Sequence, residues 1–229
     1  MNSVPWKQLF VFLCILFFNH VSLAQDAVDF GTQSTVVPGN PGRSLDRGTN
    51  QLGVWAGYSP NNPTPLGRKT NRPVFMFNVQ YAGVLITGDN WAMKYIADFV
   101  PVAIIKQPHQ VYGKNGKPKD LPNSEQTIPG VGISPIGLQL NLRRGCVLQP
   151  YINGTAGILY FTHDVPVSDS SNFNFTFAFG AGVEIWHREN QSFILGYKFQ
   201  HISNGYTAHH NPGVDLNLFY LGYLWSWKK

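Results

Sequence analysis

Apolar and polar residues alternate with a period of two along most of the chain, most clearly over residues 172–186. Every second residue from Phe173 to Ile185 is apolar, and those between are small or polar. This alternation is typical of a β-strand with one apolar face. Seven other segments share it, so the pattern predicts eight strands over residues 52–58, 74–86, 91–105, 132–142, 148–162, 172–186, 191–203 and 214–227.

The second face of these predicted strands carries few charges. Its main ions are Lys94, Asp98, Glu184 and Lys198, set among Gly, Ala, Asn, Gln, Thr and Ser. A soluble β-sandwich would present a densely charged face to water. Eight strands can instead close into a small barrel whose interior is filled by side chains and where opposite charges pair. We therefore predict that the apolar faces, including that of Trp91, Phe99 and Ile105, point outward.

Long and short connections alternate between the predicted strands. The long ones span residues 59–72, 106–129, 163–171 and 204–212, and the short ones span residues 87–90, 143–145 and 187–190. Long outer loops, short periplasmic turns and aromatic residues near strand ends are typical of outer-membrane barrels. The sequence therefore predicts an all-β fold, an eight-stranded antiparallel transmembrane β-barrel of the bacterial outer membrane. The alternative is a soluble exported β-domain.

Composition and the amino terminus fit an exported protein. Of the 229 residues only 13% are charged, against about 25% in a typical soluble domain. Residues 1–24 have the basic, apolar and small-residue order of a cleaved signal peptide. Residues 25–51, rich in Pro and Gly, predict an irregular segment before a barrel over residues 52–229. Cleavage would leave Cys146 as the single cysteine, so we expect no internal disulfide.

Polar residues replace apolar ones on the outward face where the seventh predicted strand ends. His201 and Ser203 share the parity of Phe199, and Asp215 has the outward parity of the eighth strand. A hairpin at residues 204–212 would bring the three side chains together. They suit nucleophilic acyl transfer, in which serine attacks, histidine acts as general base and then general acid, and the carboxylate orients the histidine.

Neighbouring residues supply donors for the oxyanion that forms in such a reaction. We expect these donors to be Asn204, Asn211 and the backbone around Gly205. The adjacent His209 and His210 point apart on an extended chain and have no acidic cluster beside them, so we predict no metal site. Spacing alone leaves a second interpretation open, a polar rim where the strands leave the membrane.

A family resemblance favours the catalytic interpretation. The strings H-I-S-N at residues 201–204 and N-P-G-V-D at residues 211–215 resemble the signature of the lipid A 3-O-deacylase family, which are outer-membrane barrels of the PagL type. The resemblance implies a triad of His201, Ser203 and Asp215 on the lipid-facing wall, no cofactor, and hydrolysis of the ester-linked 3-hydroxyacyl chain at position 3 of lipid A. The sequence departs from the family by having Asp215 where Glu is usual, and Gly205 directly after the asparagine.

The implied partner is lipopolysaccharide in the outer leaflet, met by a membrane-embedded enzyme. Net charge is +5, or +4 without Lys7, and this basic balance predicts a collar facing anionic phosphates rather than nucleic acid. Two other functions stay open at this stage: a non-catalytic structural or adhesive barrel, and a phospholipid esterase. The residues of the predicted collar are Arg68, Lys69 and Arg72, which we expect to contact substrate phosphates, and Lys106, Lys114, Lys117 and Lys119.

Overall fold

The computed structural model describes residues 45–112 and 118–228. The predicted signal peptide and residues 25–44 of the predicted irregular segment lie outside them. The strands in chain order are β1 (Thr49–Ser59), β2 (Val74–Thr87), β3 (Trp91–Gln107), β4 (Gln110–Tyr112), β5 (Pro118–Asp120), β6 (Gln126–Leu142), β7 (Leu148–Val165), β8 (Ser171–Arg188), β9 (Gln191–Ser203) and β10 (Val214–Lys228).

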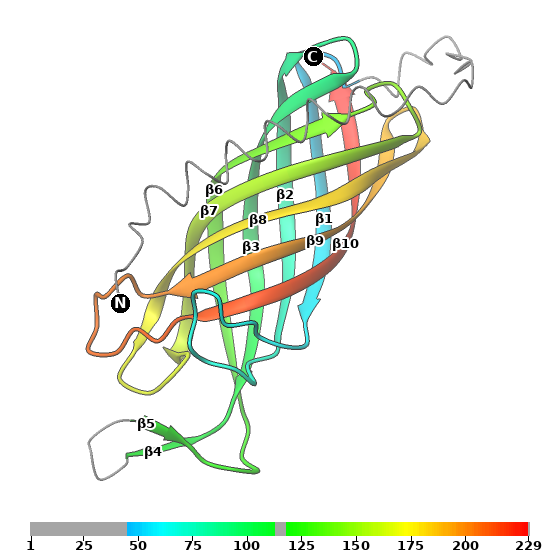
Figure 1. The fold of residues 1–229 in the computed structure, drawn as a ribbon. Helices are drawn as coiled ribbons and strands as arrows, with labels where there is room; N and C mark the ends of the chain where they lie inside the picture. The colour runs from blue at the N-terminus through cyan, green and yellow to red at the C-terminus, as the bar shows by residue number, and fades with distance from the viewer. Residues whose placement is uncertain (1–44, 113–117, 229) are drawn as a thin grey trace, which may run out of the picture. The chain divides into compact units, whose positions relative to one another are not determined.

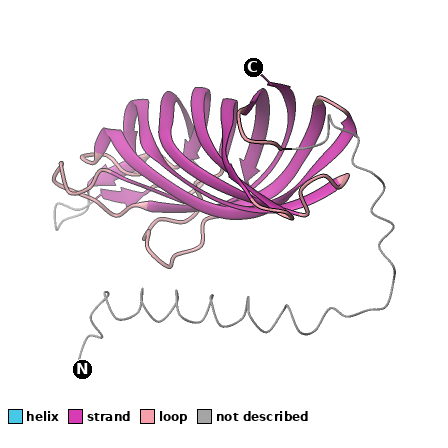
Figure 2. Cartoon of the chain, turned by 90° about the horizontal axis from the view of Figure 1, so that it is seen from above, coloured by secondary structure: helices cyan, strands magenta, loops and turns pink. Residues whose placement is uncertain are grey.

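Eight of these strands form one closed antiparallel barrel (Figures 1 and 2), in the order β1, β10, β9, β8, β7, β6, β3 and β2. The pairing of β1 with both β10 and β2 leaves no free edge, so every barrel strand has a hydrogen-bonded neighbour on each side. The predicted eight-stranded antiparallel barrel is confirmed. No helix among the described residues is long and apolar enough to cross a membrane.

The strand bounds differ from the predicted ones at a few places. β1 begins at Thr49, inside the segment predicted to be irregular, and β6 begins at Gln126, inside the predicted 106–129 connection. That connection also contains a separate two-stranded sheet, β4 with β5, which period-two reasoning missed because each strand has only three residues. Figure 1 shows this hairpin beyond the lower end of the barrel, at the rim that carries the long connections.

The barrel wall is apolar on its outside, as the alternation predicts. In β8 the residues Phe175, Phe177 and Phe179 are exposed, whereas Asn174 and Glu184 are fully buried in the interior. An apolar exterior of this kind costs free energy in water and suits a hydrocarbon surround.

Ile105 is an exception to the predicted parity. We expected it on the outward face of its strand, but its side chain is fully buried. The ladder between β3 and β6 shifts register between Val100 and Ala103, and such an irregularity changes which residues point inward. The prediction for Ile105 was therefore wrong because strict alternation does not continue through a bulge.

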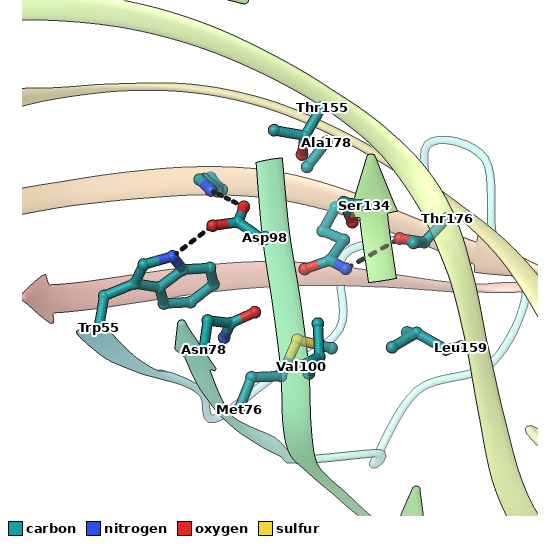
Figure 3. Close-up of a pocket in the computed structure, with 12 residues that line it drawn as sticks. Trp55, Met76, Asn78, Asp98, Val100, Ser134, Thr155, Leu159, Thr176 and Ala178 are labelled. Atoms are coloured by element: carbon teal, nitrogen blue, oxygen red, sulfur yellow. Dashed lines mark hydrogen bonds and ion pairs between the residues drawn. The ribbon is translucent and has the colours of Figure 1, made fainter. Parts of the chain in front are cut away.

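The charges predicted to face the interior are paired there. Lys94 Nζ lies 2.9 Å from Glu184 Oε2, and Lys198 Nζ lies 3.7 Å from Asp98 Oδ2. Figure 3 shows Asp98 also accepting a hydrogen bond from Nε1 of Trp55, at 3.0 Å. These pairs confirm the predicted role of the interior ions.

The interior is less polar at the end beneath the long connections than the sequence suggested. Many strand residues near those connections are fully buried and apolar. They turn this half of the interior into an apolar core that supports the rim above it. They include Val74, Ile105, Ile128, Phe161, Ile202 and Val214.

The Lys94–Glu184 pair leads to a stability prediction. Glu184 accepts hydrogen bonds from Gln51, Asn141 and Ser192 as well as from the ammonium group of Lys94. Glu184→Gln removes the carboxylate and leaves the ammonium buried without its counter-ion, so we expect a loss of about 3 kcal/mol in unfolding free energy. Urea titration of the protein in detergent micelles measures it. The exposed Glu189→Gln variant is the matched control, and equal midpoints for the two variants would contradict the prediction.

Candidate functional site

The candidate site lies on the outward face of the barrel, where β9 ends and β10 begins. His201 and Asp215 are register partners in this antiparallel pair. Asp215 Oδ1 lies 2.5 Å from His201 Nδ1, a hydrogen-bonding distance. Because Nδ1 faces the carboxylate, Nε2 is the ring nitrogen left to face a nucleophile or a substrate. The structure thus brings together two of the three residues that the hairpin was expected to juxtapose.

Ser203 lies two positions beyond His201 on the same face of β9 and is partly exposed. Alternate residues of a strand are about 6.6 Å apart, so the hydroxyl and the imidazole share one stretch of wall. Across the ladder, Ser203 pairs with Phe175 and His201 pairs with Phe177. The ring centroids of Phe177 and His201 are 5.3 Å apart. The hydroxyl of Ser203 and the imidazole of His201 therefore lie beside an aromatic surface formed by Phe175 and Phe177.

Gly213 determines how the imidazole packs from the side of β10. Its φ of +61° is in the left-handed region, where any side chain is strained. A Cβ at this position would come within 2.8 Å of Cε1 of His201. The glycine of the N-P-G-V-D string is therefore required both by the backbone conformation and by the space that the imidazole occupies.

The β9–β10 loop (residues 204–213) holds the residues expected to donate to an oxyanion. Asn204 is fully buried, and its amide group donates to Ser170 Oγ and to the carbonyl of His210. Since both amide hydrogens are engaged, its side chain supports the loop instead of facing a substrate. Asn211 accepts a hydrogen bond from the backbone N–H of Asn204. Gly205 has a φ of +63° and begins the turn that follows Asn204.

The environment of Asp215 is a feature that the sequence analysis missed. Asp215 points outward, yet its side chain is fully buried, because the β1–β2 loop (residues 60–73) covers it. The backbone N–H groups of Leu66 and Gly67 each donate to its second oxygen, Oδ2, at 2.8 Å. These two hydrogen bonds hold Oδ2 against the backbone of the loop. No side-chain pattern could have indicated them, since any residue other than proline has a backbone N–H.

Arg72 does not have the role expected of it. Its guanidinium is fully buried; Nε donates to the carbonyl of Pro166, and Nη2 donates to both carboxylate oxygens of Asp120. The expectation that Arg72 contacts a substrate phosphate is therefore corrected. Its guanidinium instead ties the β1–β2 loop to the β4–β5 hairpin and the β7–β8 connection.

The rest of the predicted basic collar is partly neutralised. Lys69 lies 3.7 Å from Asp120, and Lys106 is paired with Glu125. Lys114 and Lys117 lie outside the described residues. Arg68 and Lys119 are exposed, and the backbone of Arg68 bonds the carbonyl of Pro212 beside the site. The net positive charge of the collar is thus smaller than a count of its basic residues suggests.

Asp120 gives the loop network a pH dependence. Partial burial raises the pKa of Asp120, but hydrogen bonds from Gln110 and Arg72, with the charges of Arg72 and Lys69, bring that pKa below its ordinary value. A lowered folded-state pKa means that the pairing stabilises the fold above about pH 4 and is lost as the pH falls through the folded-state pKa. We expect lower hydrogen-exchange protection factors in residues 60–73 at pH 3 than at pH 6. Asp120→Asn should remove this difference, and equal protection at both pH values in the unaltered protein would contradict it.

Metal-ligating residues do not gather in the part of the chain that the structure describes. No group of three or more His, Cys, Asp or Glu side chains there is placed to hold an ion. The rings of His209 and His210 lie 6.4 Å apart between centroids.

Together these features define a class of protein, a membrane-spanning eight-stranded β-barrel with a histidine, a serine and an aspartate gathered on its outward, apolar wall. The chain belongs to the lipid A 3-O-deacylase (PagL) family, whose model matches residues 111–224. The matched segment includes His201, Ser203 and Asp215, so the resemblance seen in the two strings is confirmed at the level of the family. The β1–β2 loop lies outside it.

Three solved structures of outer-membrane proteins are similar to this chain. The outer membrane enzyme PagL is 14% identical, with 77% of this chain and 97% of that chain covered and a TM-score of 0.49. Neisserial surface protein A is 12% identical, with 78% and 96% covered and a TM-score of 0.45. The outer membrane protein OprG from Pseudomonas aeruginosa is 14% identical, with 82% and 99% covered and a TM-score of 0.46. None of the curated proteins matches the chain.

Proposed function

We propose that this protein is an outer-membrane serine esterase that removes the ester-linked 3-hydroxyacyl chain at position 3 of lipid A. The observation that carries the proposal is the His201–Asp215 hydrogen bond on the outward wall, inside the segment matched by the lipid A 3-O-deacylase family. A site on this wall is reached by a lipid that diffuses within the membrane. The long connections share its rim, which suits the outer leaflet if the short turns are periplasmic.

Each residue has a defined part in the proposed reaction. Ser203 Oγ attacks the ester carbonyl carbon while its proton passes to Nε2 of His201, and Asp215 stabilises the imidazolium that forms. Collapse of the tetrahedral intermediate breaks the bond to the sugar oxygen, which takes the proton from His201. Water then attacks the acyl-serine through the same base, releasing a 3-hydroxy fatty acid and restoring the serine hydroxyl.

The oxyanion and the substrate phosphates need donors of their own. The backbone N–H of Gly205 and the amide of Asn211 are the proposed oxyanion donors, with Asn204 holding their loop in place. Arg68 is the proposed phosphate contact because its side chain is exposed and its backbone bonds the loop beside His201. Lys69, half-buried against Asp120, contributes charge at longer range.

A comparison of two lipids tests the proposal. Purified protein in detergent micelles is incubated with lipopolysaccharide and, separately, with phosphatidylethanolamine vesicles, and the released fatty acids are identified by mass spectrometry. The proposal predicts 3-hydroxy fatty acid from lipopolysaccharide and little release from the vesicles. Release from phospholipid alone would instead indicate a phospholipid esterase, and release from neither would favour a non-catalytic barrel.

A further inference from the structure

The β1–β2 loop is built onto the start of β10, not merely placed near it. Residue 69 forms a parallel bridge with residue 214, and the backbone N–H of Arg68 donates to the carbonyl of Pro212 at 2.7 Å. Gly67 packs so closely that a Cβ there would lie 2.8 Å from the backbone nitrogen of Asp215. The loop and the strand therefore approach each other with no room for a side chain at residue 67.

This contact leaves one oxygen of Asp215 for the imidazole. Two N–H donors occupy Oδ2, while Oδ1 faces Nδ1 of His201. The carboxylate cannot rotate without breaking both bonds from the loop, so its orientation toward His201 is fixed. Aspartate is one methylene shorter than the glutamate usual at this position in the family, and the loop holds the shorter carboxylate in a defined position.

Asn62 holds the loop in this arrangement. Its side chain is almost fully buried, and its amide nitrogen donates to the carbonyls of Arg72 and Asp215, both at 3.0 Å. Its amide oxygen accepts from the backbone N–H of Arg72. One side chain thus joins both ends of the loop to the strand that carries the carboxylate.

We propose that the β1–β2 loop is part of the catalytic site, with Asn62 as the positioning residue that keeps the Leu66 and Gly67 amides on Asp215. The inference rests on the proposed function. It goes beyond that function by assigning a catalytic role to residues 60–73, which lie outside the segment that the family model matches. The loop's task is to keep the carboxylate aimed at Nδ1 of His201, so that Nε2 faces the serine and can accept its proton.

Two variants and a control test this role. Asn62→Asp keeps an acceptor for the N–H of Arg72 but replaces the donor with a charge facing two carbonyl oxygens. Gly67→Ala places a Cβ against the backbone of β10. Thr64→Ala changes an exposed side chain of the same loop. Heat-modified migration on gels verifies that each barrel is folded before lipopolysaccharide kinetics are measured.

We expect Asn62→Asp and Gly67→Ala to lower kcat by about tenfold to a hundredfold, since small displacements of catalytic groups have effects of this size. In Asn62→Asp, KM should change by less than about twofold, because the wall that binds the acyl chains is untouched. In proton NMR spectra, the far-downfield Nδ1–H signal of His201 should weaken or vanish in both variants. Thr64→Ala should match the unaltered protein in both measurements.

The results distinguish a failure of the role of the loop from a failure of the proposed esterase function. If the unaltered protein is active while both loop variants keep its kcat and its His201 signal, the role of the loop is wrong and the proposed function stands. If the unaltered protein releases no acyl chain, the proposed function fails, and the catalytic role of the loop fails with it.

Discussion

Ser203→Ala is expected to lower the rate of 3-hydroxy fatty acid release from lipopolysaccharide by at least about 10⁴-fold. The methyl group keeps the size of the site and removes the atom that would form the acyl intermediate. Ser203 lies on the outward face at the end of β9, so the change leaves the barrel interior untouched. KM for lipopolysaccharide should stay within about threefold, because the wall that binds the acyl chains is unchanged.

Fatty-acid release followed by mass spectrometry gives both rates. Ser168→Ala is the matched control, since Ser168 belongs to a neighbouring connection and its backbone N–H, not its hydroxyl, carries the hydrogen bond to Gln110. That control should retain the rate of the unaltered protein. A Ser203→Ala variant with more than a hundredth of the original rate would rule out the serine as nucleophile.

The second large effect is expected for Asp215→Asn, with a fall in kcat of about 10⁴-fold. The N–H groups of Leu66 and Gly67 point at Oδ2, so the new amide would turn its oxygen toward them and its NH₂ toward His201. Nδ1 must then accept a hydrogen bond, which places the ring proton on Nε2. In that tautomer Nε2 cannot take the proton of Ser203.

The same release assay measures this effect, with Asp89→Asn as the control because it removes an identical charge at an exposed turn. A folded Asp215→Asn variant that keeps a tenth of the original activity would show that the base works without the carboxylate. Loss of the downfield His201 signal in this variant would link the lost activity to the tautomer.

Much of the barrel could be predicted because a strand with one apolar face repeats every two residues. The odd positions of β8 and β9 point outward as the alternation indicated, and β10 follows β9 as a hairpin partner. Parity together with the hairpin expected at residues 204–212 was therefore enough to bring His201 and Asp215 onto one outward patch. The paired interior ions Lys94 and Glu184 follow from the same parity.

The parts that escaped prediction depend on contacts between segments far apart in the chain. The bulge in β3 reversed the parity of Ile105. Arg72 is buried in an ion pair with Asp120, a residue of β5 that lies far from it in the sequence. The cover over Asp215 is made by backbone N–H groups of Leu66 and Gly67, and it depends on how the β1–β2 loop folds back onto β10. Such loop-to-strand contacts leave no periodic signal in the sequence.

The most direct test of the central claim is tandem mass spectrometry of lipid A from Gram-negative cells that produce the protein or its Ser203→Ala variant. We expect lipid A from cells with the unaltered protein to lack one 3-hydroxyacyl chain, and the missing chain to map to position 3. Lipid A from cells with the variant should keep that chain. Identical lipid A in the two strains, with both proteins folded in the outer membrane, would contradict the account.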